Sequence, residues 1–262
     1  MYSIAEARNR VIQREKRRLV TGRMKNGTYF VSIDFDGTVS DVDVTDAVIE
    51  KFAGAGWQEA EKLWQSGSIG SRECLTAQMA LINSSMASVM AFVDRLSLDP
   101  DFKFFVESLC SQSVPFAIVS DGFYPFIQRI LENEGLGDIP VFANHLKKGV
   151  SGLEPVFPYS NMNCRSGTCK CTVVESISKG LPIIHIGDGR SDFCISEKAA
   201  HVFSKAELTG FCEKRQIGHT AFETFADLSE SITNMRFRTA GSREMPAWLV
   251  REDLEEAWTI ND

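Results

Sequence analysis

Residues 29–38 read Tyr-Phe-Val-Ser-Ile-Asp-Phe-Asp-Gly-Thr, and this stretch decides the fold. Its first half is a short, aromatic and β-branched run, typical of a strand that is buried on both faces. Two similar runs follow, Pro-Phe-Ala-Ile-Val-Ser at 115–120 and Leu-Pro-Ile-Ile-His-Ile at 181–186. Helical patterns separate the three runs, which predicts βαβ units and a parallel sheet.

A small polar cluster closes each of the three predicted strands. The clusters read Asp-Phe-Asp-Gly-Thr from Asp34, Ser-Asp-Gly from Ser120, and Gly-Asp-Gly-Arg-Ser-Asp from Gly187. In open parallel sheets, ligands bind in the crevice outside the carboxyl ends of the strands. We therefore expect the three clusters to converge on one site.

The long segment between the first and second strands predicts an inserted unit. It is too long for a single crossover, and its apolar spacing predicts helices at 44–52, 57–64, 71–82 and 86–96. We predict an α/β protein whose core is a Rossmann-like parallel sheet and whose insert is a helical cap. The predicted division is an N-terminal helical extension at 1–27, a core at 28–43 and 101–235, a cap at 44–100, and a C-terminal tail at 236–262.

Carboxylates gather at two of these strand ends, with Asp34 and Asp36 after the first strand and Asp188 and Asp192 after the third. Either pair alone could be a solvated turn or a helix cap. Four acids in one crevice repel one another unless a cation lies among them. Oxygen ligands of this kind suit a hard cation such as Mg²⁺, so the sequence predicts a magnesium site.

The second strand end predicts an anion site. Ser120, Asp121 and Gly122 close that strand and open a helix, where a hydroxyl and free amides can bind a phosphate. Lys170 lies near the start of a further predicted helix, and its ammonium could pair with the same anion. A lone lysine there could equally be an ordinary exposed side chain.

Taken together, the clusters resemble the haloacid-dehalogenase-like phosphohydrolases over about residues 28–215. The cluster from Asp34 is similar to the first motif of that superfamily, Ser120 to the second, Lys170 to the third and the cluster from Gly187 to the fourth. The phosphoserine phosphatase-like branch fits best. Within it the chain looks most like the 2-hydroxy-3-keto-5-methylthiopentenyl-1-phosphate phosphatases, on the strength of Ser-Arg-Glu-Cys-Leu from Ser71 and a Cys-Lys-Cys run.

The resemblance implies a Mg²⁺-dependent phosphatase that acts on a small phosphorylated metabolite. It implies that Asp34 is the nucleophile and that Asp36 is the general acid and base. The metal would be held by Asp34, the backbone carbonyl of Asp36, and Asp188. Asp192 would orient a metal-bound water or the Lys170 ammonium. Ser120, Asp121, Gly122 and Lys170 would surround the phosphoryl group.

Three residues are candidates for substrate recognition. Phosphoserine phosphatases read the substrate amine with a Glu where this chain has Asp43, which could read an amine or hydroxyl or simply open a helix. Those enzymes bind the substrate carboxylate with an Arg of the cap, and this chain has Gln78 there. Arg72 could substitute or could face solvent. The missing Arg favours a small polyol- or keto-phosphate without a carboxylate.

The active-site pattern leaves two alternatives open. A phosphotransferase or mutase would use the same aspartate if a hydroxyl took the place of water. A non-enzymatic binding protein could share the fold, but such proteins commonly lose one of the motif residues, all of which are present here.

Composition excludes several other classes. With 35 acidic against 28 basic residues the formal net charge is −7, which argues against binding to nucleic acid or to anionic membrane. No membrane-spanning run or secretory signal is evident. The seven cysteines are expected to be reduced thiols of a cytoplasmic protein. Cys164, Cys169 and Cys171 do not match a paired zinc site, and no fourth ligand is evident unless His145 folds close.

Overall fold

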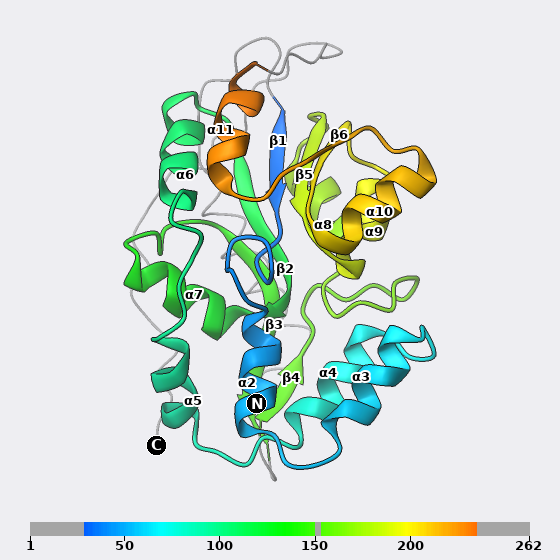
Figure 1. Cartoon of the computed structure of the whole chain (residues 1–262). Helices are drawn as coiled ribbons and strands as arrows, with labels where there is room; N and C mark the ends of the chain where they lie inside the picture. The colour runs from blue at the N-terminus through cyan, green and yellow to red at the C-terminus, as the bar shows by residue number, and fades with distance from the viewer. Residues whose placement is uncertain (1–28, 150–152, 235–262) are drawn as a thin grey trace.

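The computed structural model describes residues 29–149 and 153–234, which form one sheet with helices on both faces (Figure 1). Within these residues the sheet has seven strands, in the order β4-β3-β2-β1-β5-β6-β7. Every pairing is parallel except that of β3 with β4. The strands are β1 (Phe30–Ile33), β2 (Phe116–Phe123), β3 (Val141–Lys148), β4 (Leu153–Val156), β5 (Ile183–Gly187), β6 (His201–Ser204) and β7 (His219–Ala221).

The three apolar runs predicted as buried strands are β1, β2 and β5, and they are neighbours at the centre of the sheet. All four residues of β1 are buried. Val31 and Ile33 pack in the larger core cluster on one face, and Phe30 packs in the second cluster on the other. Successive side chains of a strand point to opposite faces, so a strand with helices on both sides must be apolar throughout. The α/β prediction is confirmed.

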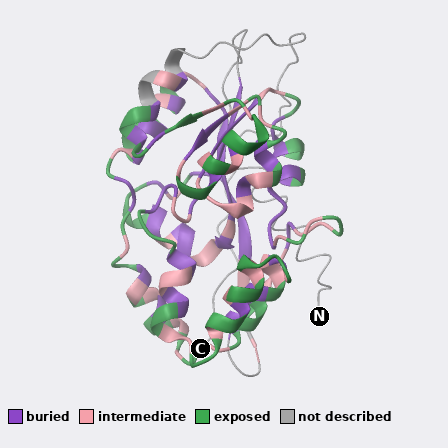
Figure 2. Ribbon diagram, turned by 45° about the vertical axis from the view of Figure 1, so that its right-hand side comes forward, coloured by how far each residue is buried: buried purple, intermediate pink, exposed green. Residues whose placement is uncertain are grey.

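Two layers of helices cover the sheet, as Figure 1 shows. One layer contains α6 (Phe102–Ser111), α7 (Tyr124–Asn133) and α11 (Phe225–Asn234). The other contains α8 (Lys170–Ile177), the 3-10 turn η1 (Arg190–Asp192), α9 (Phe193–Ser196) and α10 (Ala206–Arg215). Figure 2 shows buried residues along the centre and exposed ones on the outer sides of the helices.

The segment inserted after β1 is helical, close to the predicted bounds. Its helices are α2 (Val44–Phe52), α3 (Trp57–Gln65), α4 (Ser71–Met79) and α5 (Met86–Val93). Asp43 caps α2 by accepting a hydrogen bond from the amide of Asp46, and Ser85 caps α5 through the amide of Ser88. In Figure 1 the α3–α4 pair lies beyond the carboxyl ends of the central strands.

The second strand is longer than the sequence predicted. Its pattern placed the end at Ser120, but β2 continues to Phe123 after a register shift against β3. Helix α7 then begins at Tyr124, with Pro125 in its first turn. Ser120, which was expected at a helix start, therefore lies within an irregular part of the strand.

The predicted N-terminal extension at 1–27 and the tail at 236–262 lie outside the described residues. Among the residues that the structure describes, no helix combines the length and apolar character that a bilayer crossing requires.

Helix α11 is held to helix α6 by Phe225, and this contact gives a test of the fold. Its ring is buried and lies 4.9 and 5.0 Å from those of Phe102 and Phe105 on α6, measured between centroids. We expect Phe225→Ala to lower the free energy of unfolding by about 3–5 kcal/mol in denaturant titrations, because it opens a cavity. Phe104→Ala, on the exposed side of α6, is the control and should change it by less than about 0.5 kcal/mol. Equal effects of the two changes would contradict this packing.

Candidate active site

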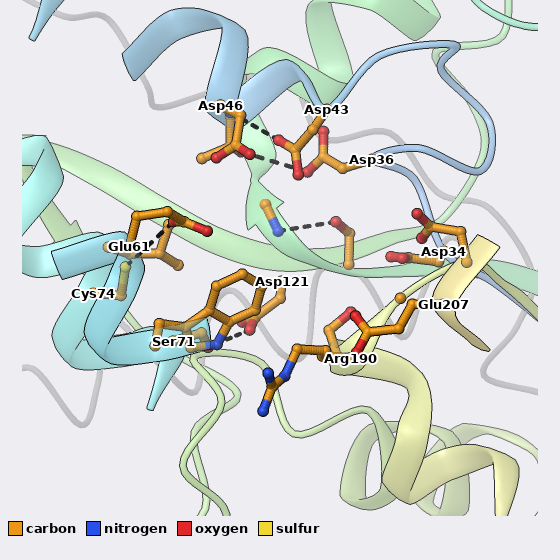
Figure 3. A pocket seen from close by; sticks show the side chains of 18 of the residues that line it. Asp34, Asp36, Asp43, Asp46, Glu61, Ser71, Cys74, Asp121, Arg190 and Glu207 are labelled. Carbon is orange, nitrogen blue, oxygen red and sulfur yellow. Dashed lines mark hydrogen bonds between the residues drawn. The ribbon is translucent and has the colours of Figure 1, made fainter. Parts of the chain in front are cut away.

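A cavity of about 260 Å³ opens at the carboxyl ends of the central strands (Figure 3). Strand-end residues line one side of it, and residues of α2, α3 and α4 line the other. The strand-end clusters therefore converge as expected, and the helical insert closes over them. The predicted site residues in the lining are Asp34, Asp36, Asp43, Gln78, Ser120, Asp121, Gly122 and Asp188.

Asp34 directly follows β1 and is 4% exposed. Its backbone amide donates to the carbonyl of Ile186 in β5, which fixes the end of one central strand against the other. One of its carboxylate oxygens, Oδ1, lies 2.7 Å from Nζ of Lys170. Burial, and then the nearby Asp192 carboxylate, raise the pKa of Asp34 well above its ordinary value. A positive charge beside this side chain would restore the carboxylate form.

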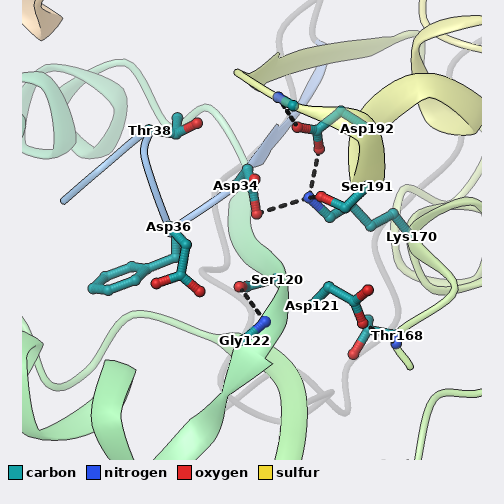
Figure 4. Close-up of polar contacts among 12 residues, drawn as sticks. Asp34, Asp36, Thr38, Ser120, Asp121, Gly122, Thr168, Lys170, Ser191 and Asp192 are labelled. Carbon is teal, nitrogen blue, oxygen red and sulfur yellow. Dashed lines mark hydrogen bonds and ion pairs between the residues drawn. The ribbon is translucent and has the colours of Figure 1, made fainter. Parts of the chain in front are cut away.

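Lys170 is the first residue of α8 and is completely buried (Figure 4). Its Nζ contacts Oδ1 of Asp34, lies 2.5 Å from Oδ1 of Asp192 and donates to Oγ of Ser191 at 2.9 Å. Burial alone would lower the pKa of Lys170, but the Asp192 and Asp34 carboxylates raise it above its ordinary value. Lys170, which the sequence alone did not distinguish from an exposed lysine, therefore lies at the centre of the cluster as a cation.

Asp192 is also fully buried, and its second carboxylate oxygen accepts hydrogen bonds from the amides of Asp188 and Gly189 at 3.2 Å each. Burial would raise its pKa, but Lys170 and then His185 lower the pKa of Asp192 below its ordinary value. With both oxygens engaged, Asp192 braces the loop that carries Asp188.

His185 is a residue of this site that the sequence analysis did not assign. It lies in β5 and is completely buried, with Nε2 2.8 Å from Oδ1 of Asp192 and Nδ1 3.3 Å from Oγ of Ser32. His185 and Lys170 thus contact the same oxygen of Asp192. A polar residue inside an otherwise apolar strand was the available signal, because buried polar groups need partners.

Three carboxylates form a group that can hold a cation. Oxygens of Asp34, Asp188 and Asp192 lie within 4.8 Å of one another. Asp188 accepts from Oγ1 of Thr38 at 3.3 Å, and burial and then Asp192 raise the pKa of Asp188 to about 6. Since Asp192 is saturated by hydrogen bonds, Asp34 and Asp188 are the ligands with oxygens to offer. An all-oxygen, partly buried set fits Mg²⁺.

Gly37 is required between the two strand ends. It has φ +69°, and a Cβ built there would collide with the Asp188 carboxylate. A side chain at this position would therefore displace a predicted metal ligand as well as strain the turn.

The Asp36 carboxylate points away from this group, toward the start of α2. It accepts from the amide of Val44 at 2.9 Å and from Oγ1 of Thr45 at 3.4 Å. Burial raises the pKa of Asp36 to about 7. A Cβ built on Gly122 would overlap the Asp36 carboxylate, so the backbone of β2 and this carboxyl group are in close contact.

Ser120 and Gly122 bond to each other in this structure. The amide of Gly122 donates to Oγ of Ser120 at 2.9 Å. Both line the cavity. The two groups that the sequence assigned to a phosphate are therefore adjacent and satisfy one another (Figure 4).

Asp121 has partners other than those expected from the sequence. Its carboxylate accepts from Oγ of Ser71, from the amide of Thr168 at 2.7 Å and from Nδ2 of Asn144 at 3.1 Å. The side chain thereby connects α4 to the core. Three donors already occupy this carboxylate, and its negative charge would repel a phosphate. The expectation that Asp121 binds phosphate therefore does not fit its side chain.

The structure distinguishes among the three residues that were candidates for substrate recognition. Asp43 lines the cavity while it caps α2, and Gln78 is 1% exposed in the lining, where Nε2 donates to Oε2 of Glu61 at 3.1 Å. Arg72 is outside the lining, with its amide directed at the carbonyl of Arg165. The suggestion that Arg72 contacts substrate therefore does not fit, because the side of α4 that faces the cavity carries Gln78.

Two arginines of the core bind the connection between α3 and α4. Arg165 donates to the carbonyls of Gly67 at 2.9 Å and Ser68 at 2.7 Å, and Arg190 donates to that of Gln65 at 2.5 Å. The Gln65 carbonyl lies at the carboxyl end of α3, which carries partial negative charge. The insert is thereby fastened to the core at the rim of the cavity.

Comparison with known proteins agrees with this geometry. The family model described as "Putative Phosphatase" matches residues 29–221. A 2-hydroxy-3-keto-5-methylthiopentenyl-1-phosphate phosphatase of Exiguobacterium sibiricum is 30% identical over 212 residues, covering 78% of this chain and 96% of the relative. A second protein of that name, from Exiguobacterium sp., is 29% identical over 205 residues, covering 76% and 94%.

Solved structures share the fold. A substrate-bound phosphoserine phosphatase superposes with a TM-score of 0.62 at 20% identity, covering 81% of this chain and all of the other. A phospho-aspartyl intermediate analogue of phosphoserine phosphatase gives 0.61, covering 80% and 99%. On this agreement of motif, fold and family, the chain belongs to the "Putative Phosphatase" family and is a phosphatase, with the fold of the haloacid-dehalogenase-like phosphoserine phosphatases.

Proposed function

We propose that the protein is a Mg²⁺-dependent phosphomonoesterase that hydrolyses a small phosphorylated metabolite through an aspartyl-phosphate on Asp34. One observation carries the proposal. Asp34 is held at the end of β1 beside the Lys170 ammonium, at 2.7 Å, in a buried group of acids that faces a cavity. A nucleophile fixed next to a cation can approach phosphorus without repelling the phosphate.

The chemistry divides between two carboxyl groups. The Asp34 carboxylate attacks phosphorus, and the bond from phosphorus to the ester oxygen breaks. Asp36, whose pKa burial raises to about 7, gives its proton to that leaving oxygen. Asp36 then removes a proton from the water that hydrolyses the aspartyl-phosphate. A pKa near the working pH suits both transfers.

The groups that would hold the metal are the Asp34 and Asp188 carboxylates and the backbone carbonyl of Asp36. Bound there, Mg²⁺ would neutralise charge on the phosphoryl oxygens. Lys170 pairs with the phosphoryl oxygens, and Asp192 with His185 keeps its ammonium in place. Ser120 and the Gly122 amide exchange their mutual hydrogen bond for contacts with phosphoryl oxygens.

Asp36→Asn tests the acid–base assignment. The amide keeps the shape and can still contact Val44 and Thr45, but it cannot transfer a proton. We expect kcat to fall by about 10²–10⁴-fold for alkyl phosphates. The loss should be smaller for p-nitrophenyl phosphate, because its leaving group needs no proton. An equal loss for both esters would instead indicate a positioning role.

The acidic side chains that line the cavity on the side of α2 and α3 indicate the chemistry of the substrate. Asp43, Asp46 and Glu61 line this side together with Trp64. Burial, and then the Glu61 carboxylate, raise the pKa of Asp46 to about 6. A second anionic group on the substrate would be repelled there. We propose a phosphate ester whose remainder is uncharged or cationic and carries hydrogen-bond donors, such as a polyol- or keto-phosphate.

We propose that the helices of residues 44–100 act as a cap that sets substrate choice, and Gln78→Ala tests this. Gln78 faces the cavity from α4, whereas Asp34 faces it from the end of β1. Gln78 could therefore contact the part of a substrate away from phosphorus. We expect kcat/KM for the preferred ester to fall about tenfold to a hundredfold, the value of one hydrogen bond of roughly 1–3 kcal/mol.

A generic aryl phosphate is the control for Gln78→Ala, because it offers the cap little to bind, and its hydrolysis should change much less. Thr76→Ala, on the exposed side of α4, should leave every substrate unaffected. If Gln78→Ala slowed all esters equally, its hydrogen bond to Glu61 would be serving the cap's structure and the specificity role would be wrong.

A further inference from the structure

Four cysteines gather around the starts of α8 and α9, next to Lys170. Cys164 precedes α8 in the chain, Cys169 and Cys171 flank Lys170 at the start of α8, and Cys194 belongs to α9. The sulfur atoms of Cys171 and Cys194 lie 3.2 Å apart, in hydrogen-bond contact. Cys164 is also in hydrogen-bond contact with Cys194. The sequence spacing did not show this group, because Cys194 comes from a separate segment.

The two closest thiols are unequal. Cys171 is 6% exposed, whereas Cys194 is exposed to solvent. The hydrogen bond with Cys194 and, more weakly, the Lys198 ammonium lower the pKa of Cys171 below its ordinary value. Cys169 is engaged elsewhere, with its sulfur 3.2 Å from Oγ1 of Thr172. The pair thus combines one accessible sulfur with a buried one whose pKa its neighbours lower, and a lowered thiol pKa favours oxidation.

We propose that Cys171 and Cys194 form a redox-modification site, at which a peroxide converts the two thiols into a disulfide that joins α8 to α9. One thiolate of the pair attacks a peroxide oxygen, the O–O bond breaks and hydroxide leaves, which gives a sulfenic acid. The second sulfur displaces hydroxide from that sulfenic acid and forms the S–S bond, and its proton neutralises the hydroxide. Two thiols and one hydrogen peroxide yield one disulfide and two waters.

The disulfide would shift the catalytic cluster through the backbone that links each cysteine to a residue of that cluster. Cys171 directly follows Lys170, and Cys194 comes two residues after Asp192, so the new bond joins the two segments that the Lys170–Asp192 ion pair already joins. A disulfide bond is about 2.05 Å long, against 3.2 Å between these sulfurs. Closing it shifts the two segments by roughly 1 Å, and such misplacement can cost about 10²-fold in rate. This consequence rests on the proposed function, whereas the disulfide does not.

The test uses the full reduced chain, treated with equimolar hydrogen peroxide after the reductant is removed. We expect the intact mass to fall by two hydrogens and non-reducing peptide mapping to show a link between residues 171 and 194. We expect kcat for p-nitrophenyl phosphate, measured with Mg²⁺, to fall about tenfold or more. Dithiothreitol should restore both mass and rate.

Two variants make the result specific. Cys194→Ser should keep the basal rate, form no link and lose the response to peroxide. Cys110→Ser, which removes an exposed thiol on α6, should behave as the wild type does. Mapping does not depend on activity, so an inactive preparation that still formed the link would count against the proposed phosphatase function and not against this site.

Three outcomes would overturn the proposal. A peroxide-induced link from Cys164 to Cys194 would assign the chemistry to another pair. Zinc bound to the purified reduced protein, and lost in Cys171→Ser, would make the group a metal site. A complete link between residues 171 and 194 with an unchanged rate would refute its coupling to the catalytic cluster.

Discussion

Asp34→Asn should abolish turnover. The amide is nearly isosteric with the carboxylate but is not a nucleophile, so no aspartyl-phosphate can form. We expect kcat to fall by roughly 10⁴-fold or more, as in other enzymes that lose their nucleophile. The decrease should be the same for p-nitrophenyl phosphate and for alkyl phosphates, because both must react at Asp34. Steady-state phosphate release measures it.

The fold of the Asp34→Asn variant must be checked separately, because Lys170 loses one of its two carboxylate partners and keeps the other, Asp192. We expect an unchanged circular dichroism spectrum and a cooperative thermal transition. Asp94→Asn is the matched control, since Asp94 pairs with Arg129 on the surface and should tolerate the change. Wild-type turnover by Asp34→Asn would place the nucleophile elsewhere.

Removal of divalent metal should have the second-largest effect. Without a cation, burial and neighbouring carboxylates raise the pKa of Asp34 well above its ordinary value and that of Asp188 to about 6. The nucleophile then tends to hold a proton, and the phosphoryl charge lacks a counterion. We expect chelation to lower the rate by about 10³-fold or more, since metal stabilisation is worth several kcal/mol.

Added Mg²⁺ should restore the rate of the chelated enzyme. Mg²⁺ should also raise the melting temperature of the wild type, through binding to the native state, and should do so far less for Asp188→Asn. This second readout does not require activity. Full activity in excess chelator would rule out the metal assignment.

The sequence predicted best those features that depend on short local patterns, namely the central strands and the residues at their ends. The run that ends in Asp34 predicted a central buried strand, and the similar runs at 115–120 and 181–186 predicted its neighbours, because strands covered on both faces must be continuously apolar. The structure confirmed these strands and the convergence of their ends. The family resemblance was confirmed by the relatives.

The sequence predicted least where a residue's role depends on partners far along the chain. Nothing near Asp121 indicates that Ser71 and Thr168 would occupy its carboxylate. Likewise, the pairing of Cys171 with Cys194 appears only when α8 and α9 are packed together. Helical periodicity could not decide between Gln78 and Arg72, because it does not show which side of a short helix meets a cavity formed by other segments.

The central place of β1 has a consequence for how the protein is made. Of the described strands, β1 is synthesised first, yet it lies between β2 and β5, with Ile33 paired to Ile186. Such distant pairing slows folding, because a long loop must close before the contacts stabilise it. On the ribosome, β1 must wait with one edge open until β5 has emerged, and an open apolar strand is prone to aggregate or to bind chaperones. The nascent chain should therefore gain protease resistance and phosphatase activity together, once Asp192 has left the exit tunnel.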